Sequence, residues 1–310
     1  VLHGGEAMTE PKLVDDQVKQ VIRDCIPLGP LHNPANLMGI EVCQDLFPGT
    51  PNVAVFDTQF GMSMPPESYM YGLPYEYYED LHIRRYGFHG TSHTYVSKKT
   101  AEFLHKPLSE TNCIVMHLGN GSSLSCTKNG KCLDTSMGLT PLEGMIMGTR
   151  CGTLDPAIVP FIMKKKGFTP EEMDTLMNKK SGLQALCGSA DMRDVHKERE
   201  NGNKRAELAF RMLVHGIKKI LGSYFFLLGG KVDAVTFTAG IGEHDELVRA
   251  AVMEGLEGIG FKLDPEANRA RKSGARVISA PDSRIPILVI PTNEELQIAE
   301  TAVEVVSKNK

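Results

Sequence analysis

The sequence has 310 residues and a formal net charge of −4 at pH 7, with acidic and basic residues mixed along the chain. This length suits one large domain or two ordinary ones, and the mixed charge excludes a nucleic-acid surface, which needs a clustered basic face. No apolar run approaches the roughly 18 to 20 residues that span a bilayer, and residues 1–25 lack the apolar centre of a signal peptide. Seven cysteines without a Cys-x-x-Cys pair indicate reduced thiols. The sequence therefore predicts a cytoplasmic protein that binds neither nucleic acid nor membrane.

The first 58 residues look like the later part of a longer structure. Residues 1–6 have the character of strand interior and turn and no initiating Met, so we expect the chain to begin inside a larger protein. A helix is predicted over 12–26, a loop carrying His32, and a second helix over 36–46. A short apolar strand over 52–56 then delivers Asp57 at its carboxyl end, where it is either a ligand-binding residue or a turn or helix cap.

Residues 59–78 are rich in Pro, Met and Tyr and suit either a connection between domains or a partner-facing surface, and we place a domain boundary near them. In 86–93, glycines flank His89, and Thr91 and Ser92 can cap a helix that runs to about Leu104. His89 is either aimed at an anion at this helix start or is a structural histidine. A zinc site shared with the histidine four positions later is disfavoured, because a glycine follows His89.

The stretch 113–125 is an apolar run, a turn with two glycines and two serines, and a returning strand. Such a turn presents backbone N–H groups to an anion, so it is either a phosphate loop or an ordinary Asn-Gly hairpin. A second hairpin is predicted at 128–131, with a strand over 132–134. The glycine-rich segment 134–156 carries Arg150, which either grips a phosphate or pairs with Asp155.

Further along, Thr169 begins a helix with a capping box, 189–194 is a polar turn, and 204–228 is one long helix with a broad apolar face. The buried strand 232–238 enters a glycine turn at 239–244, and Asp245 starts a helix, a geometry typical of nucleotide binding. The dinucleotide and P-loop patterns are incomplete, so NAD and P-loop sites are disfavoured. After a strand over 285–290, Thr292 and Glu295 form a second capping box, which leaves Glu294 without a structural role.

In this order, the motifs resemble the acetate kinase family of the actin, sugar-kinase and heat-shock-protein superfamily. The segments that carry the resemblance are 31–34, 53–58, 86–93, 117–121, 134–144, 147–150, 237–243 and 291–295. The resemblance implies reversible, in-line transfer of a phosphoryl group from ATP to acetate, giving acetyl phosphate and ADP, with Mg²⁺ (or Mn²⁺) and a homodimer. The implied fold is α/β, with two ribonuclease-H-like lobes around a nucleotide cleft.

The resemblance also implies roles for individual residues. Arg150 and His89 would stabilise the transferring phosphoryl group, and Asp57 would be the acidic residue of the active site. Glu294 would hold the metal, and His32 and Asn120 are further catalytic positions. The residues expected to contact ATP are His117, Leu118, Gly119, Asn120, Gly121, Asp191, Met192, Arg193, Gly240, Ile241, Gly242, Glu243 and His244. The expected pocket for the acetate methyl group consists of Leu2, Leu31, Phe88 and Pro141.

The chain departs from the family at its beginning. The family's Asn-x-Gly-Ser-Ser-Ser phosphate loop and a Gly-His-Arg segment precede the first residue, and His244 stands where the family usually has Asn. We therefore expect 1–58, with 295–310 packing back on it, to be the remnant of an incomplete first lobe and 59–294 to be the nucleotide-binding lobe. Two alternatives stay open: a propionate kinase, or a truncated inactive fragment that at most binds nucleotide or a partner subunit.

Overall fold

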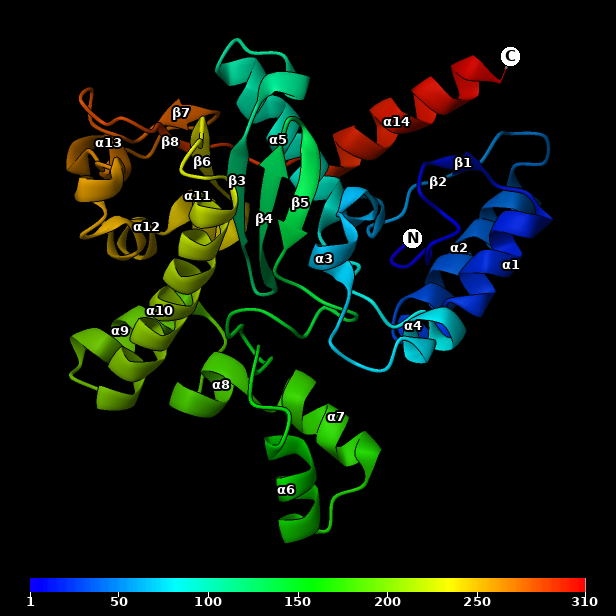
Figure 1. Ribbon diagram of the computed structural model, residues 1–310, viewed down its shortest axis with the longest axis horizontal. Helices are drawn as coiled ribbons and strands as arrows, with labels where there is room; N and C mark the ends of the chain where they lie inside the picture. The colour runs from blue at the N-terminus through cyan, green and yellow to red at the C-terminus, as the bar shows by residue number, and fades with distance from the viewer. Residues whose placement is uncertain (310) are drawn as a thin grey trace. The chain divides into compact units, whose positions relative to one another are not determined.

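The structure, a computed structural model, describes residues 1–309, which form two α/β units (Figure 1). Unit 1 consists of Val1–Asn112, Ser125–Pro141 and the chain from Thr292 onward, and unit 2 consists of Cys113–Leu124 and Leu142–Pro291. Residues 59–112 belong to unit 1 in this division. The expected boundary between the lobes at residue 58 stays a prediction. Among residues 1–309, no helix combines the length and the apolar character needed to cross a membrane.

Unit 1 is built from short strands and from helices of uneven length. Its elements are β1 (Lys12–Leu13), α1 (Asp16–Asp24), η1 (Ile26–Leu28), α2 (Asn33–Leu46), β2 (Val53–Ala54), η2 (Gln59–Ser63), α3 (Pro66–Tyr69), α4 (Glu76–Leu81), α5 (Gly90–Phe103), η3 (Leu108–Glu110), the end of β4, β5 (Lys131–Thr135) and α14 (Glu294–Lys308). β1 pairs antiparallel with β2, and α14 lies against α5 and both of these strands.

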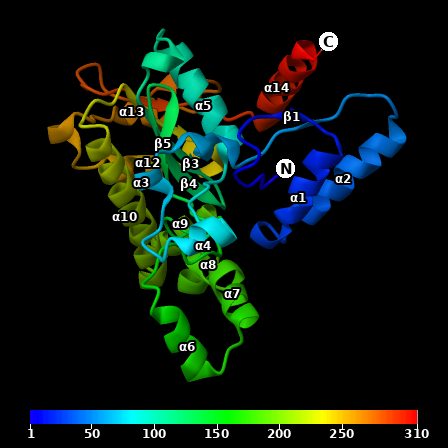
Figure 2. The same cartoon turned by 45° about the vertical axis from the view of Figure 1, so that its right-hand side comes forward.

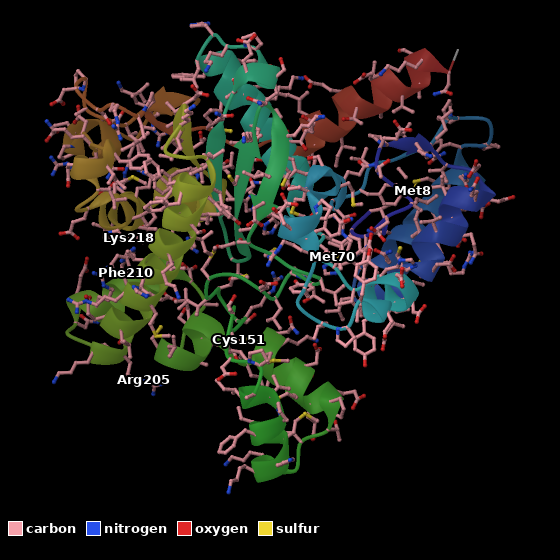
Figure 3. The ribbon with its side chains drawn as sticks, in the orientation of Figure 1. Met8, Met70, Cys151, Arg205, Phe210 and Lys218 are labelled. Atoms are coloured by element: carbon pink, nitrogen blue, oxygen red, sulfur yellow. The ribbon has the colours of Figure 1, made fainter. Side chains whose placement is uncertain are left out.

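A small core holds the first helices of unit 1 to β2. Val18 and Ile22, one turn apart on α1, are buried with Phe56 and with Met8, which is labelled in Figure 3. Asn33 is fully buried at the start of α2, where its Nδ2 donates to the carbonyls of His3 and Ile22 and its Oδ1 accepts from the N–H of His3. This side chain fixes the first residues of the chain against α1 and α2.

Unit 2 is centred on buried parallel strands. Its elements are β3 (Cys113–Leu118), the beginning of β4 (Ser122–Lys128), α6 (Ile158–Lys166), α7 (Pro170–Lys179), α8 (Gly182–Cys187), α9 (Met192–Glu200), α10 (Lys204–Leu227), β6 (Ala234–Thr238), α11 (Ala239–His244), α12 (Glu246–Met253), η4 (Glu257–Ile259), α13 (Pro265–Arg269), β7 (Arg276–Val277) and β8 (Ile287–Val289). The strands pair in the order β3-β6-β8-β7, parallel except for β7, and every residue of β3, β6 and β8 is buried. Such continuous apolar runs are typical of strands covered on both faces.

The helices of unit 2 differ in how they meet these strands. α10 lies against β3, α8, α9 and α12, with Leu213, Ile217 and Leu221 buried along one face (Figure 1). α6 and α7 pack on each other and extend away from the rest of the unit in both views (Figure 2). The sequence prediction of one long helix, and of a capping box at Thr169 with Glu172, is confirmed.

Several predicted element boundaries are wrong, because capping groups decide where helices begin. The helix predicted over 12–26 starts only at Asp16, since Asp15 caps it and Lys12–Leu13 join β2. The helix predicted from residue 36 starts earlier, at Asn33, and His32 lies in the turn before it, as predicted.

Two turns were also misassigned. The expected glycine turn at 239–244 is the short helix α11, and the polar turn at 189–194 contains the start of α9, capped by Asp191. At the last helix the expected capping box of Thr292 does not form, because the side chain of Asn293 accepts from the N–H of Leu296.

The two Asn-Gly pairs behave differently. Asn129 and Gly130 both have positive φ angles, 52° and 74°, as a two-residue hairpin of type I′ requires, which confirms the predicted hairpin between β4 and β5. Asn120 and Gly121 lack this conformation. The turn between β3 and β4 is therefore not a type I′ hairpin turn.

Candidate active site

Asp57 follows β2 and holds the beginning of α5. Its Oδ2 accepts a hydrogen bond from the backbone N–H of His89 at 2.6 Å, and its Oδ1 accepts one from the N–H of Thr91 at 3.1 Å. Its backbone carbonyl accepts from the N–H of Gly90 at 3.1 Å. The carboxylate thus satisfies N–H groups that a helix start leaves without partners, and it lies at the positive end of the helix dipole.

His89 and Gly90 allow this close approach. His89 has φ of 58°, in the left-handed region that non-glycine residues seldom occupy, and such strain is concentrated at functional positions. A Cβ on Gly90 would lie 2.1 Å from the carbonyl oxygen of Asp57, so only glycine fits there. The expectation that Thr91 or Ser92 caps α5 is wrong, because the helix already begins at Gly90 and Asp57 accepts its N–H groups.

A second carboxylate, that of Glu294, lies near Asp57. The hydroxyls of Ser92 on α5 and Thr292, two residues before Glu294, are 2.7 Å apart, which joins the starts of α5 and α14. Burial, and then the charge of Asp57, raise the pKa of Glu294. Burial also raises the pKa of Asp57, although the N–H groups of Thr91 and His89 oppose this shift. Two partly buried carboxylates that disfavour each other's charge are a suitable place for a cation.

This pair has the donor set that Mg²⁺ prefers in phosphoryl-transfer sites, which is one or two carboxylates completed by water and substrate phosphates. Within residues 1–309, no group of three or more His, Cys, Asp or Glu side chains could hold a metal ion by itself. Asp57 and Glu294 therefore fit a cation that binds together with a phosphorylated substrate.

The residues expected to form the apolar pocket are placed unevenly within unit 1. Leu2 lies next to His3, whose ring centroid is 5.8 Å from that of Phe88, and Phe88 is 2% exposed. Leu31 is 68% exposed, and Pro141 is partly buried. The structure thus brings Leu2 and Phe88 into one region and leaves Leu31 open to solvent beside exposed His32.

In unit 2, the turn between β3 and β4 presents Gly119 and Asn120 to a cavity. His117 and Leu118 are buried at the end of β3, where His117 is in register with Thr238 of β6. The N–H of Gly119 bonds to the carbonyl of Gly121 at 3.1 Å and closes the turn. The carbonyl of Asn120 accepts from the N–H of Gly148 at 3.1 Å, which ties the turn to the loop that carries Arg150.

Asp191 and Arg193 form an ion pair at the start of α9. Arg193 donates through Nε to Oδ1 of Asp191 at 3.0 Å and through Nη2 to Oδ2 at 2.5 Å. The guanidinium and the N–H of Arg193 lower the pKa of Asp191 to about 2. The pair gives this rim of the cavity an exposed, planar polar group.

The predicted glycine turn, now α11, forms another wall. Glu243 accepts the N–H of Ala239 at 3.0 Å, and Ala239 has φ of 64°, so the chain turns sharply out of β6. A Cβ on Gly240 would meet no atom within 4 Å, which means that this backbone faces open space. Gly242 packs near Phe237 in the interior, and His244 keeps 80% of its side chain exposed.

These segments surround a cavity of about 810 Å³, a size that suits a nucleotide-sized ligand. Of the residues expected to contact ATP, eight line it: Gly119, Asn120, Asp191, Met192, Arg193, Gly240, Ile241 and His244. Five others, His117, Leu118, Gly121, Gly242 and Glu243, are not among its lining residues and lie in the supporting strand, turn and helix.

Arg150 belongs to a loop of unit 2 that is held by backbone hydrogen bonds. Its carbonyl accepts from the N–H of Met147 at 3.1 Å, and Nη1 lies 3.7 Å from the sulfur of Met147. Burial lowers the pKa of its guanidinium. The alternative partner, Asp155, instead accepts the N–H of Ala157. A partly desolvated guanidinium beside a thioether is suited to gripping an anion.

Sequence reasoning missed several lining residues of the cavity: Ala190, His196, Asp245, Glu246, Leu247 and Arg271. His196 and Asp245 are joined by a 2.7 Å hydrogen bond between α9 and the start of α12. Arg199 extends this contact by bonding to Nδ1 of His196 at 2.9 Å and lying over the ring of Phe210, which is labelled in Figure 3. The available signal was the position of His196, about one turn after Asp191 on the same helix.

Comparisons with known proteins agree on one family. The sequence pattern described as "Acetokinase family" matches residues 1–300. The chain is 70% identical over 308 residues to an acetate kinase of Desulfovibrio desulfuricans, covering 99% of this chain and 76% of that protein. The crystal structure of Porphyromonas gingivalis acetate kinase has a TM-score of 0.95 at 41% identity, with 99% and 77% coverage. That of a propionate kinase from Francisella tularensis has a TM-score of 0.92 at 42% identity, with 97% and 77% coverage. These structures confirm the expected two-lobe α/β fold.

Proposed function

The chain belongs to the acetokinase family, and from this premise we propose that it transfers a phosphoryl group reversibly between ATP and acetate. The products of the forward reaction are acetyl phosphate and ADP. The observation that carries the proposal is the match over residues 1–300, together with 70% identity to an acetate kinase. The enzyme is a phosphotransferase with a carboxyl group as acceptor.

The residues of the chain act by alignment and by charge. One oxygen of the acetate carboxylate attacks the γ-phosphorus in line, the bond from phosphorus to the bridging oxygen breaks, and ADP leaves with that electron pair. Acetate is already an anion at neutral pH, so no side chain needs to remove a proton. Arg150 and His89 stabilise the charge on the transferring group, and an arginine in this role elsewhere contributes roughly 10³ to 10⁵ in rate.

The cavity of unit 2 binds the nucleotide in this proposal. Its glycine-lined wall at Gly240 lets a ligand approach the backbone closely, and Asn120 offers an amide at the opposite turn. Asp191 and Arg193 supply the polar rim. His117, Leu118, Gly121, Gly242 and Glu243 hold the turn and α11 in place.

Mg²⁺ supplies positive charge for the phosphate oxygens when it is bound. Asp57 and Glu294 hold it in this proposal, which their proximity and raised pKa values support. Asp57 keeps its position because two backbone N–H groups fix its two oxygens. Its function is thus to bind the cation or its waters rather than to transfer a proton.

We further propose that the enzyme is a homodimer in the cytoplasm and that it prefers acetate to propionate. The seven cysteines are present as thiols, which suits a reducing compartment. The apolar residues Leu2, Leu31, Phe88, and Pro141 set the size of the acyl pocket in this proposal. One methylene is worth roughly 10- to 200-fold in discrimination, so a measurable preference is expected.

The test is formation of the acyl phosphate from ATP, Mg²⁺ and either acid, trapped with hydroxylamine and measured as kcat/KM. A higher value for acetate supports the proposal, and a higher value for propionate assigns the chain to the alternative substrate. Absence of both activities, with nucleotide binding retained, would support the inactive-fragment alternative. Light scattering after size-exclusion chromatography tests the dimer.

A further inference from the structure

A second cavity of about 480 Å³ lies in unit 2 next to the proposed nucleotide cavity. It shares His244, Glu246 and Arg271 with its larger neighbour. The cavity is lined by Glu243, His244, Glu246, Arg249, Asn268, Arg269, Ala270, Arg271, Lys272, Ser273 and Arg276. Five of these side chains are cationic and two are carboxylates, so the cavity has a strong positive excess.

Arg249 is the most deeply buried of these cations. Only 2% of it is exposed, yet its three hydrogen bonds go to uncharged groups. Nε donates to Oδ1 of Asn268 at 2.7 Å, Nη2 donates to the carbonyl of Asn268 at 2.8 Å, and Nη1 donates to the carbonyl of Gly242 at 3.0 Å. Among residues 1–309 Arg249 forms no direct ion pair with a carboxylate, although the charges of Asp245 and Glu246 act on it.

Arg276, on β7, adds a second guanidinium to the same wall. Nη2 donates to the carbonyl of Glu243 at 3.1 Å, whereas its buried Nε has no hydrogen-bond partner among the described residues. Burial, and then the charge of Arg276, lower the pKa of Arg249 to about 10, although the charges of Asp245 and Glu246 oppose this shift. Two repelling guanidinium groups and a buried donor without a partner are costly, and an anion bound beside them would lower both costs.

The rim of the cavity carries further cationic side chains. Arg271 and Lys272 are exposed in the segment that follows α13, and neither forms an ion pair in residues 1–309. Arg269 is paired with Glu266, and Oε1 of Glu243 accepts the N–H of Ala239. Arg271 and Lys272 thus add two exposed cations to the lining of the cavity that holds Arg276.

We propose that this cavity binds a phosphate-type polyanion, separate from the nucleotide, and that its occupation reduces nucleotide affinity. Arg249 and Arg276 hold the carbonyls of Gly242 and Glu243 in α11, which also forms the nucleotide wall, so both sites act on one segment. Guanidinium groups in a fixed fork recognise phosphate oxygens well. The coupling rests on the proposed nucleotide site, whereas binding of the anion does not.

The experiment uses inorganic pyrophosphate as the probe and the whole chain, saturated with ADP, at constant ionic strength. Isothermal titration calorimetry should show one pyrophosphate per chain. Lys272→Glu, which lines only this second cavity, should weaken that binding roughly tenfold through reversal of a nearby charge. Lys219→Glu, an exposed lysine on α10 outside both cavities, is the matched control and should leave it unchanged.

Two further measurements test whether the pyrophosphate site is distinct from the site of the nucleotide phosphates. Arg276→Gln removes the unused donor and should also weaken pyrophosphate, and in the unmodified protein pyrophosphate should raise the Kd for ADP roughly threefold. Equal pyrophosphate affinity in Lys272→Glu and in the unmodified protein would overturn the proposal. So would a tenfold loss of ADP affinity in Lys272→Glu without pyrophosphate, because the cavity would then hold a phosphate of the nucleotide itself. Pyrophosphate binding without kinase activity would retain the anion site and contradict only the proposed function.

Discussion

Replacing Asp57 by asparagine tests the double role of this side chain. In the structure the two N–H groups of His89 and Thr91 bond to different oxygens of the carboxylate. Asparagine has one acceptor oxygen, so one N–H would face an NH₂ group and lose its partner. The change removes one charge-assisted hydrogen bond at the start of α5 and one charge from the pair with Glu294.

The expected loss can be worked from this geometry. A hydrogen bond to a charged group contributes about 1.5 to 3 kcal/mol, and the relief of no longer burying an ionised carboxylate offsets part of it. We expect Asp57→Asn to lower the free energy of unfolding by about 2 kcal/mol. With an unfolding entropy of about 2 cal/mol/K per residue, the 310-residue chain should melt roughly 3 °C lower.

Asp264→Asn is the matched control. Asp264 caps α13 through Oδ1 alone, which accepts from the N–H groups of Glu266 and Ala267 at 2.9 and 3.1 Å. Asparagine keeps that oxygen, so the control should lose less than about 0.5 kcal/mol. Equal melting temperatures for Asp57→Asn and Asp264→Asn would refute the capping argument.

The same variant also tests the cation. We expect Asp57→Asn to raise the Mg²⁺ concentration for half-maximal activity at least roughly tenfold, as loss of a metal-site group does elsewhere. The assay is the initial rate at saturating ATP and acetate over a range of free Mg²⁺. An unchanged Mg²⁺ dependence together with a new limb in the pH profile would refute the assignment and indicate proton transfer by Asp57.

Three other predictions concern the nucleotide cavity and pH. Gly148→Ala should raise the KM for ATP about tenfold, because a Cβ would lie 1.9 Å from Oδ1 of Asn120 and must displace that side chain. The pKa of Asp191 is about 2 in the folded protein, and in Arg193→Gln it should return toward about 4, which carboxyl-carbon NMR can measure. The stability that this pair contributes is lost as the pH falls toward 2. Burial lowers the pKa of His3 to about 4, so between about pH 6.5 and 4 only the unfolded chain binds a proton at this ring. As the pH falls through that range, the free energy of unfolding should decrease by up to about 3 kcal/mol. In His3→Gln the melting temperature should depend less on pH there.

Each of these predictions has a clear contrary outcome. Gly222→Ala, where a Cβ on α10 would meet no atom within 4 Å, should stabilise the protein by about 1 kcal/mol and leave the KM for ATP unchanged. An equal KM in Gly148→Ala would show that Asn120 does not contribute to nucleotide affinity. A normal pKa for Asp191 would mean that the exposed ion pair with Arg193 is open in solution. An unchanged pH slope in His3→Gln would mean that His3 is not the group that titrates.

The strands of unit 2 and the long helix α10 could be predicted because their patterns are local. Cys113–Leu118 is a continuous apolar run, and the apolar residues of α10 repeat with helical spacing. Helix starts were harder to predict. The cap of α5 comes from Asp57, more than thirty positions earlier, and no rule based on neighbouring residues can supply it.

The candidate site was predictable in its residues but not in its arrangement. The resemblance identified Asp57 and Glu294 separately, whereas their mutual effect on pKa depends on the packing of α14 against α5. Asp245 was recognised as a helix start, yet its bond to His196 joins α12 to α9 and requires the tertiary fold. The basic cavity around Arg249 and Arg276 left no local pattern, because its cations come from α12, α13, the segment after α13 and β7.

The hydrogen bond between Ser92 and Thr292 spans 200 positions of the chain. During synthesis at about 5–20 residues per second, Asp57 and α5 therefore leave the ribosome at least roughly ten seconds before Glu294 exists. Throughout that interval the nascent chain has a single carboxylate where the finished protein has two. If Asp57 and Glu294 hold the cation as proposed, its binding through both groups must wait until α14 has been translated.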